Sequence, residues 1–116
     1  MESQSLTQEI SQLEADFCFA LSDPTRILLL YALSEAPRNV TELTLELGIT
    51  QPNVSRHLKI LREHGLVHTV RQGTTIIYHL ADKRLIQALD LLRAVMRERL
   101  ARRVSIMDEI KAEQNA

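Results

Sequence analysis

The stretch VTELTLELGITQPNVSRHLKILREHGL, residues 40–66, decides the fold of this chain. Its first third predicts a short helix, with Thr41 as the expected N-terminal cap and Leu43, Leu45 and Leu47 as the apolar positions. Gly48 ends this helix, because glycine tolerates the left-handed backbone found just after a last helical turn. A tight turn therefore separates this helix from the next segment.

The second part of the stretch predicts another helix, between Thr50 and Gly65. Thr50 is a suitable N-cap, and Pro52 falls in the first turn, where its missing N–H is not needed. One face carries Val54, Leu58 and Leu61 at helical spacing, and Gly65 closes the helix. Two helices joined by a short turn with a glycine form a helix-turn-helix.

Polar side chains occupy the rest of the second helix. Gln and Asn can pair with adenine and Arg with guanine in the major groove, whereas Ser and Lys can also bind phosphates. The alternative is that these residues form only the solvent-exposed polar face of an ordinary core helix. The short preceding helix and the Gly48 turn favour a recognition helix instead. The predicted DNA contacts on it are Gln51, Asn53, Ser55, Arg56, His57 and Lys59.

The segment VHTVRQGTTIIYHL, residues 67–80, comes directly after this helix. It is rich in β-branched residues and is interrupted at Gln72-Gly73, which predicts two strands and a hairpin turn. A helix-turn-helix succeeded by a hairpin is a winged helix. Arg71 and Gln72 lie beside the predicted wing tip, where they are placed to reach a minor groove or a phosphate.

Length and composition set the remaining bounds. With 116 residues the chain is expected to form one domain over 1–116, mainly helical with a small hairpin. One cysteine, a polar N-terminus and no apolar run of about 18 residues predict a cytoplasmic protein without membrane contact. No glycine-rich phosphate loop, metal triad or Ser/His/Asp set is recognisable, so we expect neither an enzyme nor a cofactor.

Charge is distributed unevenly, although the formal net charge is only −1. Residues 1–24 contain no Lys or Arg, whereas residues 51–80 contain four against one acidic residue, Glu63. The local field governs contact with phosphate, so this segment suits a polyanion. The basic patch is modest, which predicts that two copies bind DNA together.

The flanking helices provide surfaces for such a pair. An apolar stripe predicts a first helix from Leu6 to about Ser22, and Asp23-Pro24 opens a largely buried second helix. Asp82 is expected to cap a last helix reaching about Lys111, which is too long for so small a domain to cover. We predict a homodimer through the first and last helices; the alternative is packing within one monomer. The predicted interface residues are Leu13, Phe17, Leu89, Leu92, Met96 and Leu100.

Four runs together resemble the ArsR/SmtB family of bacterial repressors. They are ALSDPTR at 20–26, QPNVSRHLKIL at 51–61, GLV at 65–67, and the wing from Arg71 to Leu80. The resemblance implies a dimeric winged-helix repressor with the order α-α-α-α-β-β-α, released from a pseudo-palindromic operator by a metal ion or another inducer. It covers nearly the whole chain in the right order.

The metal sites of such relatives are where this sequence departs. Asn39 and Thr41 stand where the resemblance would place thiols, and Arg84 and Val95 where it would place imidazoles. A cation beside Arg84 would be repelled, so we expect no metal at these positions. His64 and His68 have the spacing of a ligand pair, but the helix break between them removes the helical geometry.

Sensing could instead involve Cys18, the only thiol. A passive packing residue, a redox or covalent sensor, and a metal ligand remain as alternatives, and the neighbouring acidic residues disfavour its thiolate. A small organic inducer between the first and last helices, or no inducer in a constitutive repressor, also remains open. A winged-helix protein-interaction module is the rival from another class, and basic residues on the last helix could form a second polyanion surface.

Overall fold

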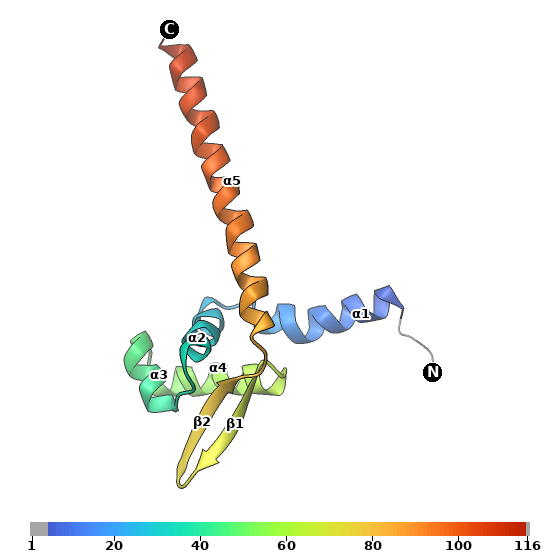
Figure 1. The fold of residues 1–116 in the computed structure, drawn as a ribbon, viewed down its shortest axis with the longest axis vertical. Coiled ribbons are helices and arrows are strands. Elements are labelled where there is room, and N and C mark those ends of the chain that lie inside the picture. The colour runs from blue at the N-terminus through green and yellow to red at the C-terminus, as the bar shows by residue number, and fades with distance from the viewer. Residues whose placement is uncertain (1–4, 116) are drawn as a thin grey trace. The chain divides into compact units, whose positions relative to one another are not determined.

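The computed structural model describes residues 5–115, which form two units, one ending at Lys83 and one beginning at Arg84 (Figure 1). The expected order of elements is confirmed, with a π-helical segment continuing the first helix. No helix within residues 5–115 is long and apolar enough to span a membrane. The elements are α1 (Leu6–Leu13), η1 (Glu14–Cys18), α2 (Pro24–Glu35), α3 (Val40–Leu47), α4 (Gln51–Glu63), β1 (Val67–Gln72), β2 (Thr75–Leu80) and α5 (Arg84–Gln114).

The first helix differs from the prediction in one respect. Ser5 and Gln8 form a capping box at its start, but the helix widens into the π-helix η1 over Glu14–Cys18, which the 3.6-residue periodicity did not predict. Leu13 is 48% exposed and Phe17 is half-buried. The apolar stripe of this helix is therefore left largely uncovered within the chain.

Helix α2 begins as expected. Asp23 is its N-cap, with Oδ1 accepting a hydrogen bond from the Thr25 backbone N–H at 2.8 Å, and Pro24 holds the first helical position. Its buried side chains face those of α4, whose predicted stripe is confirmed. The fully buried side chains of the core are Leu29, Leu30, Leu43, Val54, Leu58, Leu61 and Leu66.

Two details of α3 were predicted wrongly. Its N-cap is Asn39 rather than Thr41, because Asn39 and Glu42 form a reciprocal capping box that satisfies two backbone N–H groups. Leu45 is 79% exposed, since eight residues of helix present only part of their circumference to the core. Gly48 does end the helix, with φ of 66°.

The end of α4 is also as predicted. Gly65 has φ of 80°, and its N–H donates to Arg62 O while the N–H of Leu66 donates to Leu61 O. These two hydrogen bonds make up a Schellman motif, which turns the chain sharply into β1. At the other end, Thr50 occupies the N-cap position but makes no side-chain capping hydrogen bond.

Strands β1 and β2 pair antiparallel from Val67↔Leu80 to Gln72↔Thr75. The turn therefore consists of Gly73 and Thr74, one residue later than the predicted break, and Gly73 has φ of 63°. Arg38, in the α2–α3 connection, exchanges two backbone hydrogen bonds with Tyr78 of β2. This bridge fixes the hairpin to the helix-turn-helix.

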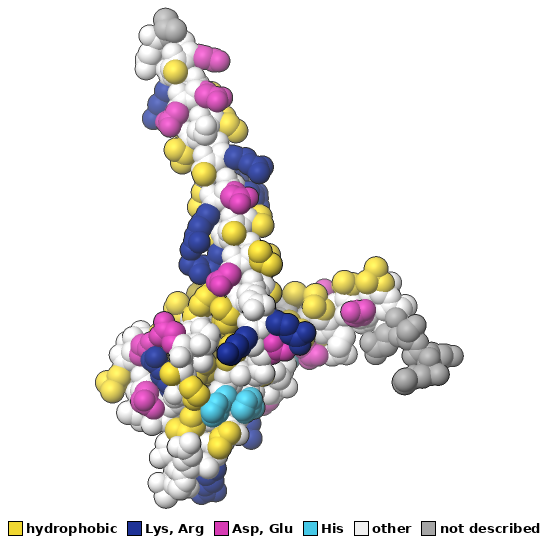
Figure 2. Space-filling view, viewed as in Figure 1, with side chains coloured by type: hydrophobic (Ala, Val, Ile, Leu, Met, Phe, Trp, Pro, Cys, Tyr) yellow, Lys and Arg dark blue, Asp and Glu magenta, His cyan; other side chains and the backbone are white. Residues whose placement is uncertain are grey.

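The second unit is the single helix α5, which continues to Gln114 and begins two residues after Asp82. Its 31 residues correspond to about 46 Å at 1.5 Å per residue. Leu89 is buried, whereas Leu92, Met96 and Leu100 are 63%, 56% and 53% exposed. Figure 2 shows hydrophobic side chains along the length of this helix, between charged ones.

Candidate nucleic-acid interface

Helix α4 presents five of the six predicted contact residues to solvent. Its first turns carry them because the buried stripe of Val54, Leu58 and Leu61 fixes which side of the helix faces outward. Arg56 Nη2 donates to Asn53 Oδ1 at 3.2 Å, one turn away. This outward face combines amide, hydroxyl and cationic groups. The exposed residues are Gln51, Asn53, Ser55, Arg56 and Lys59.

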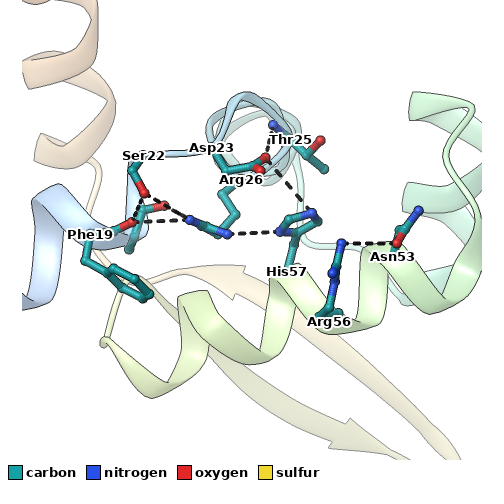
Figure 3. A network of polar contacts seen from close by, with 9 residues as sticks. Phe19, Ser22, Asp23, Thr25, Arg26, Asn53, Arg56 and His57 are labelled. Carbon is teal, nitrogen blue, oxygen red and sulfur yellow. Dashed lines mark hydrogen bonds and ion pairs between the residues drawn. The ribbon is translucent and has the colours of Figure 1, made fainter.

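His57 is the exception, and the prediction that it faces solvent is wrong. Its exposed fraction is 7%, and its imidazole lies between α4 and the start of α2 (Figure 3). The position is one residue before Leu58 on the edge of the apolar stripe, so the ring turns inward. Nδ1 lies 3.1 Å from Arg26 Nη1, and Nε2 lies 4.0 Å from Asp23 Oδ1.

Arg26 is the buried charged residue of this cluster that the sequence analysis did not single out. It is only 6% exposed, although it carries a permanent charge. Its guanidinium donates from Nε to Ala20 O at 2.7 Å and from Nη2 to Phe19 O at 3.2 Å and Ser22 Oγ at 3.3 Å (Figure 3). An arginine inside an otherwise apolar helix was the signal available in the sequence, because burying a cation requires several acceptors.

The charges of this cluster influence one another. Burial lowers the pKa of His57 below its usual value, and the nearby guanidinium groups of Arg26 and Arg56 lower it further, whereas Asp23 opposes the shift. The backbone N–H of Thr25 lowers the pKa of Asp23, and the guanidinium of Arg26 lowers it further, whereas burial opposes the shift. Because a guanidinium can only donate, His57 Nδ1 must accept. The ring is therefore neutral, with its proton on Nε2.

The wing carries the other predicted contacts. Arg71 and Gln72 are exposed at the end of β1, and Arg71 Nε donates to the carbonyl of Gly73 at 3.2 Å. That hydrogen bond holds the guanidinium beside the turn. Farther from the tip, His68 and His79 are cross-strand partners whose rings stack with centroids 5.0 Å apart.

The predicted sensing residues are dispersed. His64 lies near Asp16 and Phe19, whereas His68 lies against His79, so the two are not a pair. Within residues 5–115 there is no group of three or more His, Cys, Asp or Glu side chains arranged to hold a metal ion. Cys18 is exposed rather than partly buried. It lines an open groove of about 710 Å³ together with Ser11, Glu14, Ala15, Phe19, Ser22 and His64.

Comparison with known proteins agrees with this geometry. The family model described as "Bacterial regulatory protein, arsR family" matches residues 23–69. The uncharacterized HTH-type transcriptional regulator Rv0081 of Mycobacterium tuberculosis (strain ATCC 25618 / H37Rv) is 34% identical over 113 residues, covering 97% of this chain and 96% of the relative. The crystal structure of Rv0081 superimposes with a TM-score of 0.72 over 88% of this chain and 99% of that one.

Two further matches name an activity or an assembly. The HTH-type transcriptional repressor SmtB of the same organism is 41% identical over 78 residues, 67% of this chain and 58% of the relative. The solution structure of the homodimeric winged helix-turn-helix DNA-binding domain of Mb0332 from Mycobacterium bovis gives a TM-score of 0.71 at 27% identity, over 86% of this chain and 94% of that one.

An exposed polar helix, a preceding short helix and a two-stranded wing define a winged helix-turn-helix regulator of transcription. The chain belongs to the ArsR family of bacterial regulatory proteins.

Proposed function

We propose that this protein is a homodimeric repressor that binds a pseudo-palindromic operator in duplex DNA. The observation that carries the proposal is the outward face of α4, where groups able to pair with base edges stand side by side on a helix whose opposite face is fully buried. The repressor SmtB and the homodimeric Mb0332 domain support the two parts of the proposal.

In this proposal α4 enters the major groove and the wing contacts the backbone or the adjacent minor groove. Phosphate contacts fix the position of the protein, and base contacts specify the sequence. Two copies are needed because each recognition helix offers few cations. The residues assigned to DNA are Gln51, Asn53, Ser55, Arg56, Lys59, Arg71 and Gln72.

The dimer is proposed to form through the first and last helices. Leu92, Met96 and Leu100 repeat at intervals of four along α5 and are all more than half exposed, which is costly for a face without a partner. The first helix adds Leu13 and Phe17. Leu89 is assigned to the same stripe, although its side chain is already buried within the chain.

Selection from a randomised duplex library tests the proposal directly. The expected product is a site with two related half-sites, bound by two chains, with an affinity that falls steeply as salt is added. Sequence-independent binding, or one chain per duplex, would refute it. A protein-interaction module would show no binding to duplex DNA at low salt. In that case a search for a protein partner would replace the DNA-selection experiment.

The protein is proposed to act in the cytoplasm by binding rather than by catalysis. Its inducer is proposed to be a small organic ligand or a thiol-reactive species acting at Cys18, with a constitutive repressor as the alternative. Exposure of Cys18 in a groove supports the second of these routes. Operator release by candidate reagents distinguishes the three.

A further inference from the structure

Arg26 joins two parts of the chain that lie 31 residues apart in sequence. On one side its guanidinium binds the carbonyls of Phe19 and Ala20, at the end of the first helix, and the hydroxyl of Ser22, in the connection to α2. On the other side it binds His57, in the middle of α4. The guanidinium therefore ties the start of α2 to the recognition helix through one imidazole (Figure 3).

The contact with His57 exists in one protonation state only. Arg26 has no acceptor, so its hydrogen bond to Nδ1 requires a neutral imidazole. Protonation would place an N–H on Nδ1 facing the Nη1 N–H groups, and a second positive charge in a site that is almost closed to solvent. The charged groups around the ring are Asp23, the N-cap of α2, Arg26 of α2, and Arg56 of α4 itself.

Asp23 does not cancel this conflict. Its Oδ1 is 4.0 Å from Nε2, a separation beyond hydrogen-bond range, and the same oxygen is already engaged by the Thr25 backbone N–H. Protonated His57 therefore gains a modest attraction on one side and loses a hydrogen bond on the other. The simplest relief is a displacement of α4 away from Arg26.

The neighbour of His57 in the chain makes such a displacement matter. Arg56 follows the same helical backbone and is bonded to Asn53, and both are among the proposed base contacts. A movement of α4 of about 1 Å is enough to misplace hydrogen bonds to base edges, which require donor–acceptor distances near 2.9 Å.

We propose that Arg26 is a positioning residue for the recognition helix and that neutral His57 is the acceptor through which it acts, so that protonation of His57 weakens DNA binding. The inference rests on the proposed function. It assigns to Arg26 and His57 a role that neither plays by touching DNA.

The direction in which DNA affinity changes with pH distinguishes positioning of α4 through His57 from a general attraction between charged histidines and DNA. Acidification charges the histidines, and added positive charge strengthens binding to a polyanion. If Arg26 and neutral His57 position α4, acidification weakens DNA binding instead. DNA then binds the form with neutral His57 more tightly than the protonated form. By linkage, affinity falls by about tenfold for each unit by which the pKa of His57 is lower in the complex than in the free protein.

The experiment measures affinity for a fluorescein-labelled duplex selected by the unmodified protein, between pH 8 and pH 5.5 at constant ionic strength. We expect affinity to fall on acidification. His57→Gln keeps a neutral acceptor for Arg26 and should retain affinity throughout the range. His68→Gln, an exposed histidine on β1, is the matched control and should lose affinity as the unmodified protein does. Equal pH profiles for the unmodified protein and His57→Gln would overturn the proposal.

Two further measurements guard against a trivial outcome. Arg26→Gln, checked for folding by circular dichroism, should bind the duplex more weakly at pH 8 and show little loss on acidification. In the unmodified protein, nitrogen NMR of the His57 ring should show an unprotonated Nδ1 at pH 8 and a pKa that drops when the duplex is added. An unchanged or higher pKa in the complex would contradict the proposal. Absence of any binding at pH 8 would instead refute the proposed function.

Discussion

Arg56 and Asn53 are joined across one turn of α4, with 3.2 Å between Nη2 and Oδ1, and both side chains are exposed. The hydrogen bond restrains a long cationic side chain at the place where a recognition helix meets base edges. It also leaves the other N–H groups of the Arg56 guanidinium available, since a guanidinium has five donors.

Truncation of these contacts gives the first prediction. Arg56→Ala should weaken operator binding by about 1–3 kcal/mol and relax sequence preference, because it removes a proposed base contact. Arg71→Ala should lower affinity across sequences and reduce the salt slope by about one, because it removes a proposed phosphate contact. Fluorescence anisotropy over a salt series measures both. The control is Arg97→Ala on α5. If neither Arg56→Ala nor Arg71→Ala changes the affinity, the assignment of α4 and the wing to DNA contact is refuted.

The second prediction concerns assembly. Leu92→Asp combined with Met96→Asp should convert the dimer to monomer, because two carboxylates would enter the proposed apolar interface. The matched control places the same charges at Gln87 and Ser105, which are exposed polar positions on the same helix, and should leave the dimer intact. Sedimentation velocity at micromolar concentration distinguishes the two states. If the unmodified chain sediments as a monomer, the proposed dimer interface is refuted.

A third prediction separates a core leucine from a surface one. Leu58→Ala should cost about 2–5 kcal/mol of unfolding free energy, since its side chain is fully buried and leaves a cavity. Leu45→Ala should change the unfolding free energy by less than about 0.5 kcal/mol, because Leu45 is 79% exposed. Urea denaturation gives both values. Comparable losses would mean that α3 packs through the face that periodicity predicted.

The fourth prediction uses the cap of α2. The pKa of Asp23 is lowered in the folded protein, so its carboxylate stabilises the fold above pH 3.8, and this stabilisation is lost as the pH falls through the folded-state pKa. Asp23→Ala should therefore lower the melting temperature at pH 7, with a difference that narrows below pH 3.8. Asp23→Asn keeps a capping oxygen and should lower it less. A pH-independent difference would assign the effect to something other than the charge.

The last prediction concerns the inducer. Stoichiometric zinc, cadmium or arsenite should not release the operator through the positions where the family resemblance would place metal ligands, because this chain has Asn39, Thr41, Arg84 and Val95 there. If peroxide or persulfide releases the unmodified protein but not Cys18→Ser, the thiol is the sensor. Release by zinc would direct attention to His64 and His68, although their side chains lie against different neighbours.

Most helix boundaries and the buried face of α4 could be predicted from the sequence, because interactions between residues close in the chain determine them. Gly48, Gly65 and Asp23-Pro24 end or begin helices through their own backbone preferences, and each does so here. The predicted stripe of α4 is buried because its spacing matches the helical repeat. Thr41 failed as a cap because Asn39, two residues earlier, has Glu42 in place for a reciprocal pair.

Another feature that could not be predicted depends on a contact between distant segments. Nothing near His57 in the sequence indicates that its ring accepts a hydrogen bond from Arg26, because that contact arises only when α2 and α4 pack. The π-helix at Glu14–Cys18 was also missed, since the apolar spacing before and after it fits an ordinary helix. The exposed face of α4 was recognisable because its residue types carry chemistry that packing does not require.

The backbone bridge between Arg38 and Tyr78 has a consequence for how this protein opens. It closes a loop of about 40 residues that contains α3, α4 and the wing tip, at an entropic cost that only the complete segment can offset. The two amide protons in the bridge can exchange with solvent when these hydrogen bonds open, whether locally or with the whole loop. Their exchange rates therefore report on how firmly the hairpin is held to the α2–α3 connection, next to the proposed DNA-binding helix.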